Sequence, residues 1–166
     1  MCTGVRFADA AGNLYFGRNL DWCESYGEGV VITPRGASIP TQFLGSLSPE
    51  HACVGMGIVV GGVPCYFDCA NEAGLAIAGL NFPGYAQFAE APEEGAVNVA
   101  AYEFPVWVAA NFSAVAEVRE ALKDVVIVAK APSEGYEVAQ LHWLVGDGKE
   151  SIVIECQADG MHVYDD

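Results

Sequence analysis

The sequence predicts an α+β protein in which antiparallel strands, joined by hairpins, are covered by a layer of helices. Turn residues such as Asp9, Gly12 and the pair Gly61 and Gly62 separate short apolar runs at hairpin spacing. Residues 100–123 then change to the apolar spacing of helices. The 166 residues are enough for one ordinary domain with a sizeable core.

The first two strands form the best-defined hairpin. Residues 3–7 and 14–16 are strand-like, and residues 9–13 (Asp-Ala-Ala-Gly-Asn) supply the turn between them. An antiparallel hairpin returns the end of its second strand to the start of its first. We therefore expect Arg18 and Asp21 to lie near Cys2.

A run of strands follows, which we place at residues 29–34, 53–60, 63–67 and 75–80. These strands are nearly continuous in small and apolar residues, which predicts that both of their faces are covered. Pro83 stops the pairing after the last of them, because proline has no N–H to donate. The strand end at Asn81 is a reasonable place for a donor to an oxyanion.

Two helices and a second group of strands complete the chain. The helices are expected at residues 100–111 and 114–123, with Ser113 as the N-cap of the second. They would form a layer that covers one sheet. Further strands are predicted at residues 125–129, 141–145, 151–155 and 161–164.

The charge of the chain excludes several classes of partner. Its 22 acidic and 7 basic residues give a formal net charge of −15. Binding of nucleic acid and of anionic membranes depends on Lys and Arg, so we expect neither partner. No apolar run approaches the roughly 18 residues that span a bilayer. The start lacks a basic segment followed by an apolar one, so we expect no cleaved signal peptide and a cytoplasmic protein.

Most of the cysteines and all of the histidines are expected to have structural roles. Six cysteines without a secretion signal indicate reduced thiols, and their spacing predicts no metal site. No cofactor is expected. The three histidines, His51, His142 and His162, are interpreted as structural. The sequence also lacks the nucleophile elbow of serine hydrolases, the phosphate-binding loop and the zinc-protease motif.

Cys2 is the strongest candidate for catalysis. Removal of the initiator methionine, which a small second residue generally permits, would leave a thiol and a free α-amine on one residue. An ordinary thiol is mostly neutral at pH 7, whereas an α-amine has a pKa of about 7.7–8.0 and suits a general base. A nearby Arg18 would stabilise the thiolate and Asp21 would orient the amine. Alternatively, a cysteine at position two has no function and Arg18 and Asp21 form a surface ion pair.

The chain resembles the choloylglycine hydrolase family, which contains bile salt hydrolases and penicillin V acylases. The resemblance covers essentially all 166 residues and rests on residues 2–4, 16–22, 71–75, 78–83, 104–112, 141–143 and 151–155. It implies the αββα sandwich of N-terminal nucleophile hydrolases, with two antiparallel sheets packed face to face and helices outside each. It also implies hydrolysis of the amide bond of glycine- or taurine-conjugated bile acids.

The resemblance assigns roles to residues. Cys2 would attack the amide carbonyl, Arg18 would lie by the sulfur, Asp21 by the α-amine, and Asn81 would stabilise the oxyanion. An asparagine at this last position is similar to bile salt hydrolases, whereas penicillin acylases tend to have tyrosine. Three apolar side chains would line the pocket for the steroid body: Leu20, Val60 and Phe67.

The family has a second half of comparable size that this sequence lacks. We therefore expect residues 1–166 to be the N-terminal portion of a single domain, with open sheet edges and an uncovered apolar face. A completed protein is expected to be a homo-oligomer. Two alternatives remain: acylase chemistry on penicillin V or N-acyl-homoserine lactones at the same site, and a non-catalytic half-domain that pairs with another chain.

Overall fold

A seven-stranded antiparallel sheet forms the centre of the computed structural model, which describes residues 2–166. Hairpin turns connect most neighbouring strands, and the turn at Gly61 and Gly62 has positive φ at both glycines, as the sequence predicts. The sheet has the strand order β13-β12-β11-β8-β7-β6-β3. Its strands are β3 (Gly29–Thr33), β6 (Cys53–Val60), β7 (Val63–Asn71), β8 (Ala76–Asn81), β11 (Leu141–Gly146), β12 (Ser151–Gln157) and β13 (Gly160–Asp165).

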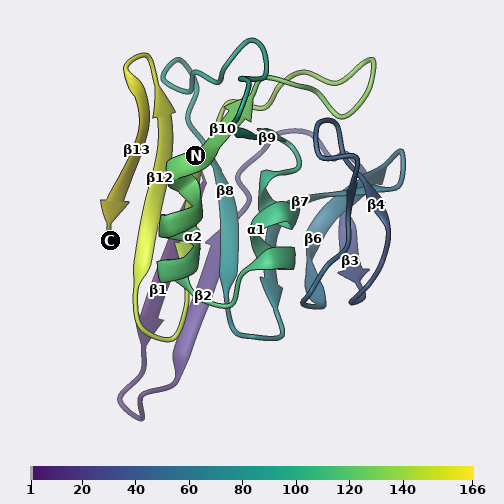
Figure 1. The fold of residues 1–166 in the computed structure, drawn as a ribbon. Coiled ribbons are helices and arrows are strands. Elements are labelled where there is room, and N and C mark those ends of the chain that lie inside the picture. The colour runs from purple at the N-terminus through teal and green to yellow at the C-terminus, as the bar shows by residue number, and fades with distance from the viewer. Residues whose placement is uncertain (1) are drawn as a thin grey trace.

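Helices cover one face of this sheet. Helix α1 (Phe104–Asn111) packs mainly on β7 and β8, with Pro105 in its first turn, where a missing N–H costs nothing. Helix α2 (Val115–Ala121) follows and continues into a short 3₁₀ turn, η1 (Leu122–Asp124). Figure 1 shows both helices in front of the sheet. The core between the layers contains Trp143, which packs edge-to-face on Phe104 with ring centroids 4.7 Å apart.

A two-stranded hairpin covers part of the opposite face. It consists of β1 (Thr3–Ala8) and β2 (Leu14–Asn19), whose antiparallel register pairs Gly4 with Arg18. Figure 1 shows this hairpin, in purple, behind the sheet. A Cβ built on Gly4 would lie 2.9 Å from Leu144 Cδ2, so the backbone of the hairpin packs closely on the main sheet at this position. The predicted hairpin is confirmed, and with it the return of Arg18 to the start of the chain.

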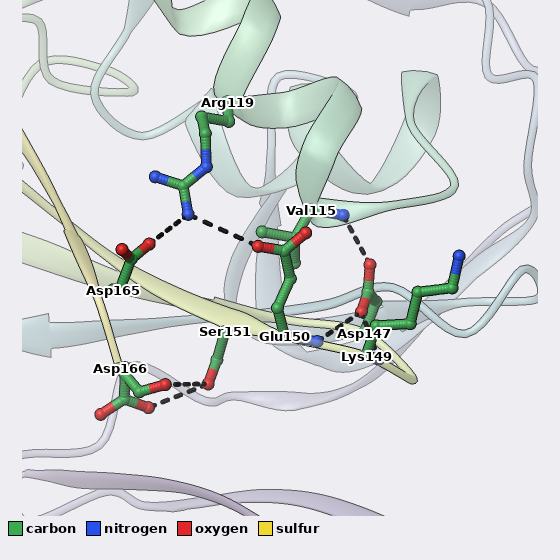
Figure 2. Close-up of polar contacts among 8 residues, drawn as sticks. All are labelled: Val115, Arg119, Asp147, Lys149, Glu150, Ser151, Asp165 and Asp166. Atoms are coloured by element: carbon green, nitrogen blue, oxygen red, sulfur yellow. Dashed lines mark hydrogen bonds and ion pairs between the residues drawn. The ribbon is translucent and has the colours of Figure 1, made fainter.

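Asp147, in the turn after β11, connects the hairpin to the helical layer. Its backbone carbonyl accepts a hydrogen bond from Arg6 Nε at 2.8 Å. Its carboxylate accepts one from the backbone N–H of Val115 at 2.8 Å, at the start of α2, as Figure 2 shows. The predicted N-cap at Ser113 is therefore wrong: Ala114 holds that position, and Asp147 satisfies the helix end from another segment.

Polar contacts also connect α2, the turn at Glu150 and the end of β13, as Figure 2 shows. Arg119 of α2 forms ion pairs with Glu150 at 3.5 Å and with Asp165 of β13 at 2.5 Å. Ser151 Oγ donates to the carboxylate of Asp166 at 3.0 Å. These contacts tie the last two strands to α2 at one edge of the sheet.

Two small sheets lie outside the main one. Strands β4 (Ile39–Pro40) and β5 (Ser46–Leu47) form an antiparallel pair in the expected irregular loop. Strands β9 (Val97–Ala100) and β10 (Val125–Val128), which precede and follow the two helices in the sequence, form a parallel pair. The prediction missed β9 and assigned its last residue to the first helix. A four-residue strand has little periodicity of its own, and its partner lies far along the sequence.

The prediction that both faces of the strands are covered is wrong for one edge of the sheet. Four side chains on the hairpin side of β3 and β6 are exposed, and we call them the exposed apolar strip: Val30 (70%), Ile32 (71%), Val54 (48%) and Met56 (38%). The register pairs Val30 with Met56 and Ile32 with Val54, so all four share one face. The hairpin lies mainly over β8 and β11 and leaves these four side chains exposed. The uncovered face expected from the family resemblance is therefore present.

Within residues 2–166, no helix has the length and apolar character needed to cross a membrane.

Candidate active site

Cys2 immediately precedes β1 and is half-buried. The backbone N–H of the next residue, Thr3, donates to Asn19 Oδ1 at 2.6 Å, which closes the hairpin at this end. Strand alternation places Cys2 on the same face as Gly4. The expected removal of the initiator methionine concerns a residue outside the described part of the chain.

The inner face of the hairpin, which we define as Cys2, Gly4, Arg6, Phe16 and Arg18, is directed at the main sheet. A Cβ on Gly4 would contact Leu80 and Leu144, and one on Gly146 would contact Arg6 and Phe16. The hairpin therefore runs along β8 and β11 with Arg6 near Gly146. From Arg6 to Gly4, the strand β1 therefore runs towards the end of β8. Cys2, two residues beyond Gly4, is then expected near the end of β8 that contains Asn81.

Arg18 lies on this inner face and is almost completely buried. Only 7% of its side chain is exposed, and its Nη2 donates to the carbonyl oxygen of Gly79 at 2.5 Å. Its Nε lies 3.7 Å from Asp68 Oδ2 on β7, an ion pair beyond hydrogen-bond distance. Within the described residues, Nε and Nη1 have no hydrogen-bond partner. Two nitrogen atoms of this buried cation thus keep unused N–H groups.

The other two predicted catalytic residues lie at the same end of the hairpin. Asp21 follows β2 by two residues, in the segment returned to the start of β1. Asn81 is the last residue of β8 and pairs with Leu141. Leu80, directly before it, faces the hairpin, so alternation directs the Asn81 side chain to the other face. Its amide can reach the hairpin side only around the strand end.

The three predicted substrate-binding side chains are more widely distributed. Leu20 is exposed just after β2, Val60 ends β6, and Phe67 lies in β7 where the pairing with β6 shifts register. Phe67 packs edge-to-face on Tyr26 at 6.2 Å, and Tyr26 lies 6.5 Å from Tyr136. The sequence interpretation missed both tyrosines, because each lies in a loop without periodicity.

A small cavity opens beside Arg18. It measures about 160 Å³ and is lined by Phe16, Gly17, Arg18, Val54, Asp68, Cys69, Ala70 and Ala76. Pockets that enclose drug-sized ligands usually span roughly 300–1,000 Å³. This cavity is smaller than that, and it includes none of the three predicted substrate-binding residues.

The other thiols differ from Cys2 in their surroundings. Burial raises the pKa of Cys53 to about 11 and the pKa values of Cys65 and Cys156 to about 12. Burial also raises the pKa of Cys69 well above its usual value. All six cysteines are free, and in residues 2–166 no group of His, Cys, Asp and Glu has the arrangement of a metal site.

His142 illustrates the structural role expected for the histidines. It is half-buried, stacks on Phe82 at 4.8 Å, and its Nδ1 lies 3.2 Å from Glu155 Oε1. His162 contacts Asp159 in the turn before β13, at 2.7 Å. Both residues join neighbouring elements, and neither is on the inner face of the hairpin.

The layered antiparallel fold, with a cysteine at the start of its first strand, defines the class of N-terminal nucleophile hydrolases. Residues 2–166 match the model of the linear amide C–N hydrolases, choloylglycine hydrolase family. The chain therefore belongs to the choloylglycine hydrolase family, as the resemblance of its motifs predicts.

Curated relatives match the whole chain but extend well beyond it. A "Bile salt hydrolase/transferase" of Bifidobacterium longum subsp. longum is 58% identical over 100% of this chain and 52% of its own length. A "Conjugated bile acid hydrolase" of Lactobacillus gasseri is 53% identical over 100% of this chain and 53% of its own length. The chain thus spans about half the length of the relatives it matches.

Solved structures support the same fold. The R18L variant of conjugated bile acid hydrolase from Clostridium perfringens is 35% identical and superimposes with a TM-score of 0.94 over 100% of this chain and 51% of that one. Penicillin V acylase from Agrobacterium tumefaciens superimposes with a TM-score of 0.73 over 99% of this chain and 49% of that one. Its identity of 18% shows a shared fold alone.

Proposed function

We propose that this chain carries the nucleophile of an enzyme that hydrolyses the amide bond of glycine- or taurine-conjugated bile acids. The observation that carries the proposal is the hairpin register, which pairs the buried Arg18 with Gly4, two residues from Cys2. Relatives 53–58% identical are named for action on bile salts or conjugated bile acids, which supports this substrate class.

The proposed chemistry begins with the N-terminal cysteine. Its α-amine takes the thiol proton, and the sulfur attacks the amide carbonyl carbon to give a tetrahedral intermediate. The amine returns the proton to the leaving nitrogen of glycine or taurine, which leaves a thioester on Cys2. Water then hydrolyses the thioester and releases the free bile acid.

Three further residues interact with the thiolate, the α-amine and the oxyanion that take part in this reaction. Arg18 stabilises the thiolate, and Asp21 holds the α-amine. Asn81 donates to the oxyanion, a contribution worth about 2.7–4 kcal/mol at comparable sites. Leu20, Val60 and Phe67 contact the apolar steroid body.

The setting of this chemistry is also part of the proposal. Residues 1–166 form the N-terminal portion of one domain, in a cytoplasmic protein that is a homo-oligomer when complete. The exposed apolar strip supports this arrangement, because a face of this kind is normally covered in a folded protein.

Release of the amino acid tests the function. The chain is incubated with taurocholate or glycocholate, alone and with a polypeptide covering the rest of the Bifidobacterium longum relative. Free taurine or glycine is then quantified. We expect release to be abolished by Cys2→Ala and unchanged by Cys23→Ala, the matched control at an exposed thiol. Equal release by Cys2→Ala, or no release in either mixture, contradicts the proposal.

Two further measurements separate the alternatives. Penicillin V and an N-acyl-homoserine lactone are assayed in parallel, and faster turnover of either would replace the bile-acid assignment. Intact mass determines whether residue 1 is removed, because a retained methionine blocks the proposed base. A chain that keeps its methionine and only associates with the added polypeptide would be a non-catalytic half-domain.

A further inference from the structure

Arg18 carries a charge that the protein places in a buried position at considerable cost. Transfer of an ion into a protein interior costs several kcal/mol unless a partner compensates it. The carbonyl of Gly79 accepts one hydrogen bond, but a carbonyl has no net charge. In the described part of the chain, the compensating charge is Asp68, whose side chain is 26% exposed.

Asp68 has the position required to act on Arg18. It pairs with Ala78 and with Met56, so it lies in the middle of the sheet on the hairpin side. Burial raises the pKa of its carboxyl, while Arg18 and a hydrogen bond from the backbone of Met56 lower it. Asp68 Oδ2 lies 3.7 Å from Arg18 Nε, so the two groups form an ion pair without a hydrogen bond to fix its geometry.

Cys2 is within reach of the same guanidinium. Gly4 pairs with Arg18, and Cys2 is two residues away on the same face, the diagonal position on a neighbouring strand. Diagonal neighbours lie about 7–8 Å apart, which long side chains can span. The charged and titratable groups nearest to the guanidinium by this register are Asp68 on β7, Arg6 on β1, and Cys2 and Asp21 at the end of the hairpin.

We propose that Asp68 is a positioning residue that acts through Arg18: it draws the guanidinium towards β7 and so limits the stabilisation of the Cys2 thiolate. The inference deepens the proposed function, on whose assignment of Cys2 and Arg18 it rests. With the carboxylate present, Arg18 divides its charge between Asp68 and the sulfur. Without it, the guanidinium has one fewer carboxylate to compensate it, and more of its positive charge acts on the thiolate.

The test is the pH profile of alkylation of Cys2 by iodoacetamide. Trypsin releases Cys2 in the peptide of residues 2–6 and Cys23 in that of residues 19–35, so mass spectrometry gives both rates from one sample. We expect Asp68→Asn to lower the pH midpoint for Cys2 by about half to one unit, a roughly three- to tenfold gain in thiolate below the midpoint. Asp68→Glu restores the wild-type midpoint. Cys23 is the internal control and does not change.

A double-mutant cycle tests the path through Arg18. In an Arg18→Gln background, Asp68→Asn is expected to leave the Cys2 profile unchanged, since no cation remains to be released. An unchanged or raised midpoint in Asp68→Asn overturns the proposal. So does an equal shift at Cys23, or a persisting shift in the Arg18→Gln background.

Folding is measured on the same samples by circular dichroism. If Asp68→Asn is unfolded in buffer, the profile is measured in trimethylamine N-oxide, an osmolyte that favours folded states without adding charge. A variant unfolded even there overturns the proposal, because Asp68 would then be structural. The assay contains no bile acid, so failure of this inference and failure of the proposed function are separate results.

Discussion

The two faces of the seven-stranded sheet are built differently. The face under α1 and α2 is closed, with Trp143, Ile77 and Ile152 each 0% exposed. The opposite face is covered by a two-stranded hairpin over β8 and β11, and is open over β3 and β6. The closed face contains the hydrophobic core, while the partly covered face contains Cys2, Arg18 and Asp68.

This difference separates stability from chemistry. Most side chains on the closed face are apolar and mutually packed, and they hold the strands in register. The hairpin face holds the buried cation of Arg18 between two β-layers, where charges interact more strongly than in water. Substitutions on the two faces should therefore differ in kind.

The largest contrast is in thiol reactivity. Cys65 and Cys156 have pKa values of about 12, so near pH 8 their thiolate is roughly a thousandfold scarcer than for a thiol with the ordinary value of 9. Brief alkylation of the folded protein should therefore modify Cys2 and the exposed Cys23 and spare these two. Peptide mass spectrometry measures the pattern. Equal modification of all four before unfolding would contradict the burial difference.

Removal of a core side chain comes next. Trp143→Ala should lower the free energy of unfolding by about 3–5 kcal/mol, the usual cost of deleting a large buried aromatic side chain. Urea unfolding followed by circular dichroism measures the change. Ile32→Ala is the matched control, because its side chain is 71% exposed. Similar losses from both substitutions would show that the two faces are equally packed.

The junction at Asp147 should have an intermediate effect. Asp147→Ala removes the acceptor for the first N–H of α2, and loss of such a cap costs about 0.5–2 kcal/mol. The same unfolding assay measures it, with Asp159→Ala as the control at an exposed turn carboxylate. A loss no larger than the control's would exclude a capping role.

The pH dependence at Asp147 has a defined sign. Burial raises its pKa, but hydrogen bonds from the backbones of Glu150, Val115 and Lys149 and the charge of Arg6 outweigh it, so the folded pKa is lowered. Its contribution to stability is therefore complete above the unfolded pKa of about 3.9 and is lost as pH falls through the folded value. Unfolding free energies measured from pH 6 to pH 2 should fall less steeply in Asp147→Asn. An identical slope would contradict this assignment.

The smallest effect on stability is expected on the exposed apolar strip. Ile32→Ser should change the free energy of unfolding by less than about 0.5 kcal/mol, as exposed positions usually do. It should nevertheless reduce self-association, because it interrupts a contiguous apolar surface. Light scattering at increasing concentration measures this. A large loss of stability would mean that this face is already covered.

Local signals in the sequence predicted most of the strands and both helices. The first hairpin follows from the turn at residues 9–13, and the second from two adjacent glycines, because turn geometry is set within a few residues. Interactions between distant segments were not predicted. Asp147 caps a helix that begins 32 residues before it. The expected cap at Ser113 was wrong because the acceptor comes from a distant segment.

The candidate site likewise combines a local feature, which the sequence predicted, with a contact between distant segments, which it did not. The proximity of Arg18 to Cys2 follows from hairpin register, a local property, and the structure confirms that register. Asp68 is 50 residues from Arg18, and its sequence surroundings are those of an ordinary apolar strand. Only the pairing of β7 with β8, beneath the hairpin, brings the two charges together.

We propose that Cys2 forms a covalent thioester with the bile-acid carbonyl. The most direct test is to mix the chain and the complementary polypeptide with glycocholate, quench in acid within one turnover, and determine the mass of each cysteine peptide. We expect one cholyl adduct on the peptide of residues 2–6, lost on longer incubation as glycine accumulates. An adduct on another cysteine, or glycine release with no adduct on Cys2, would contradict it.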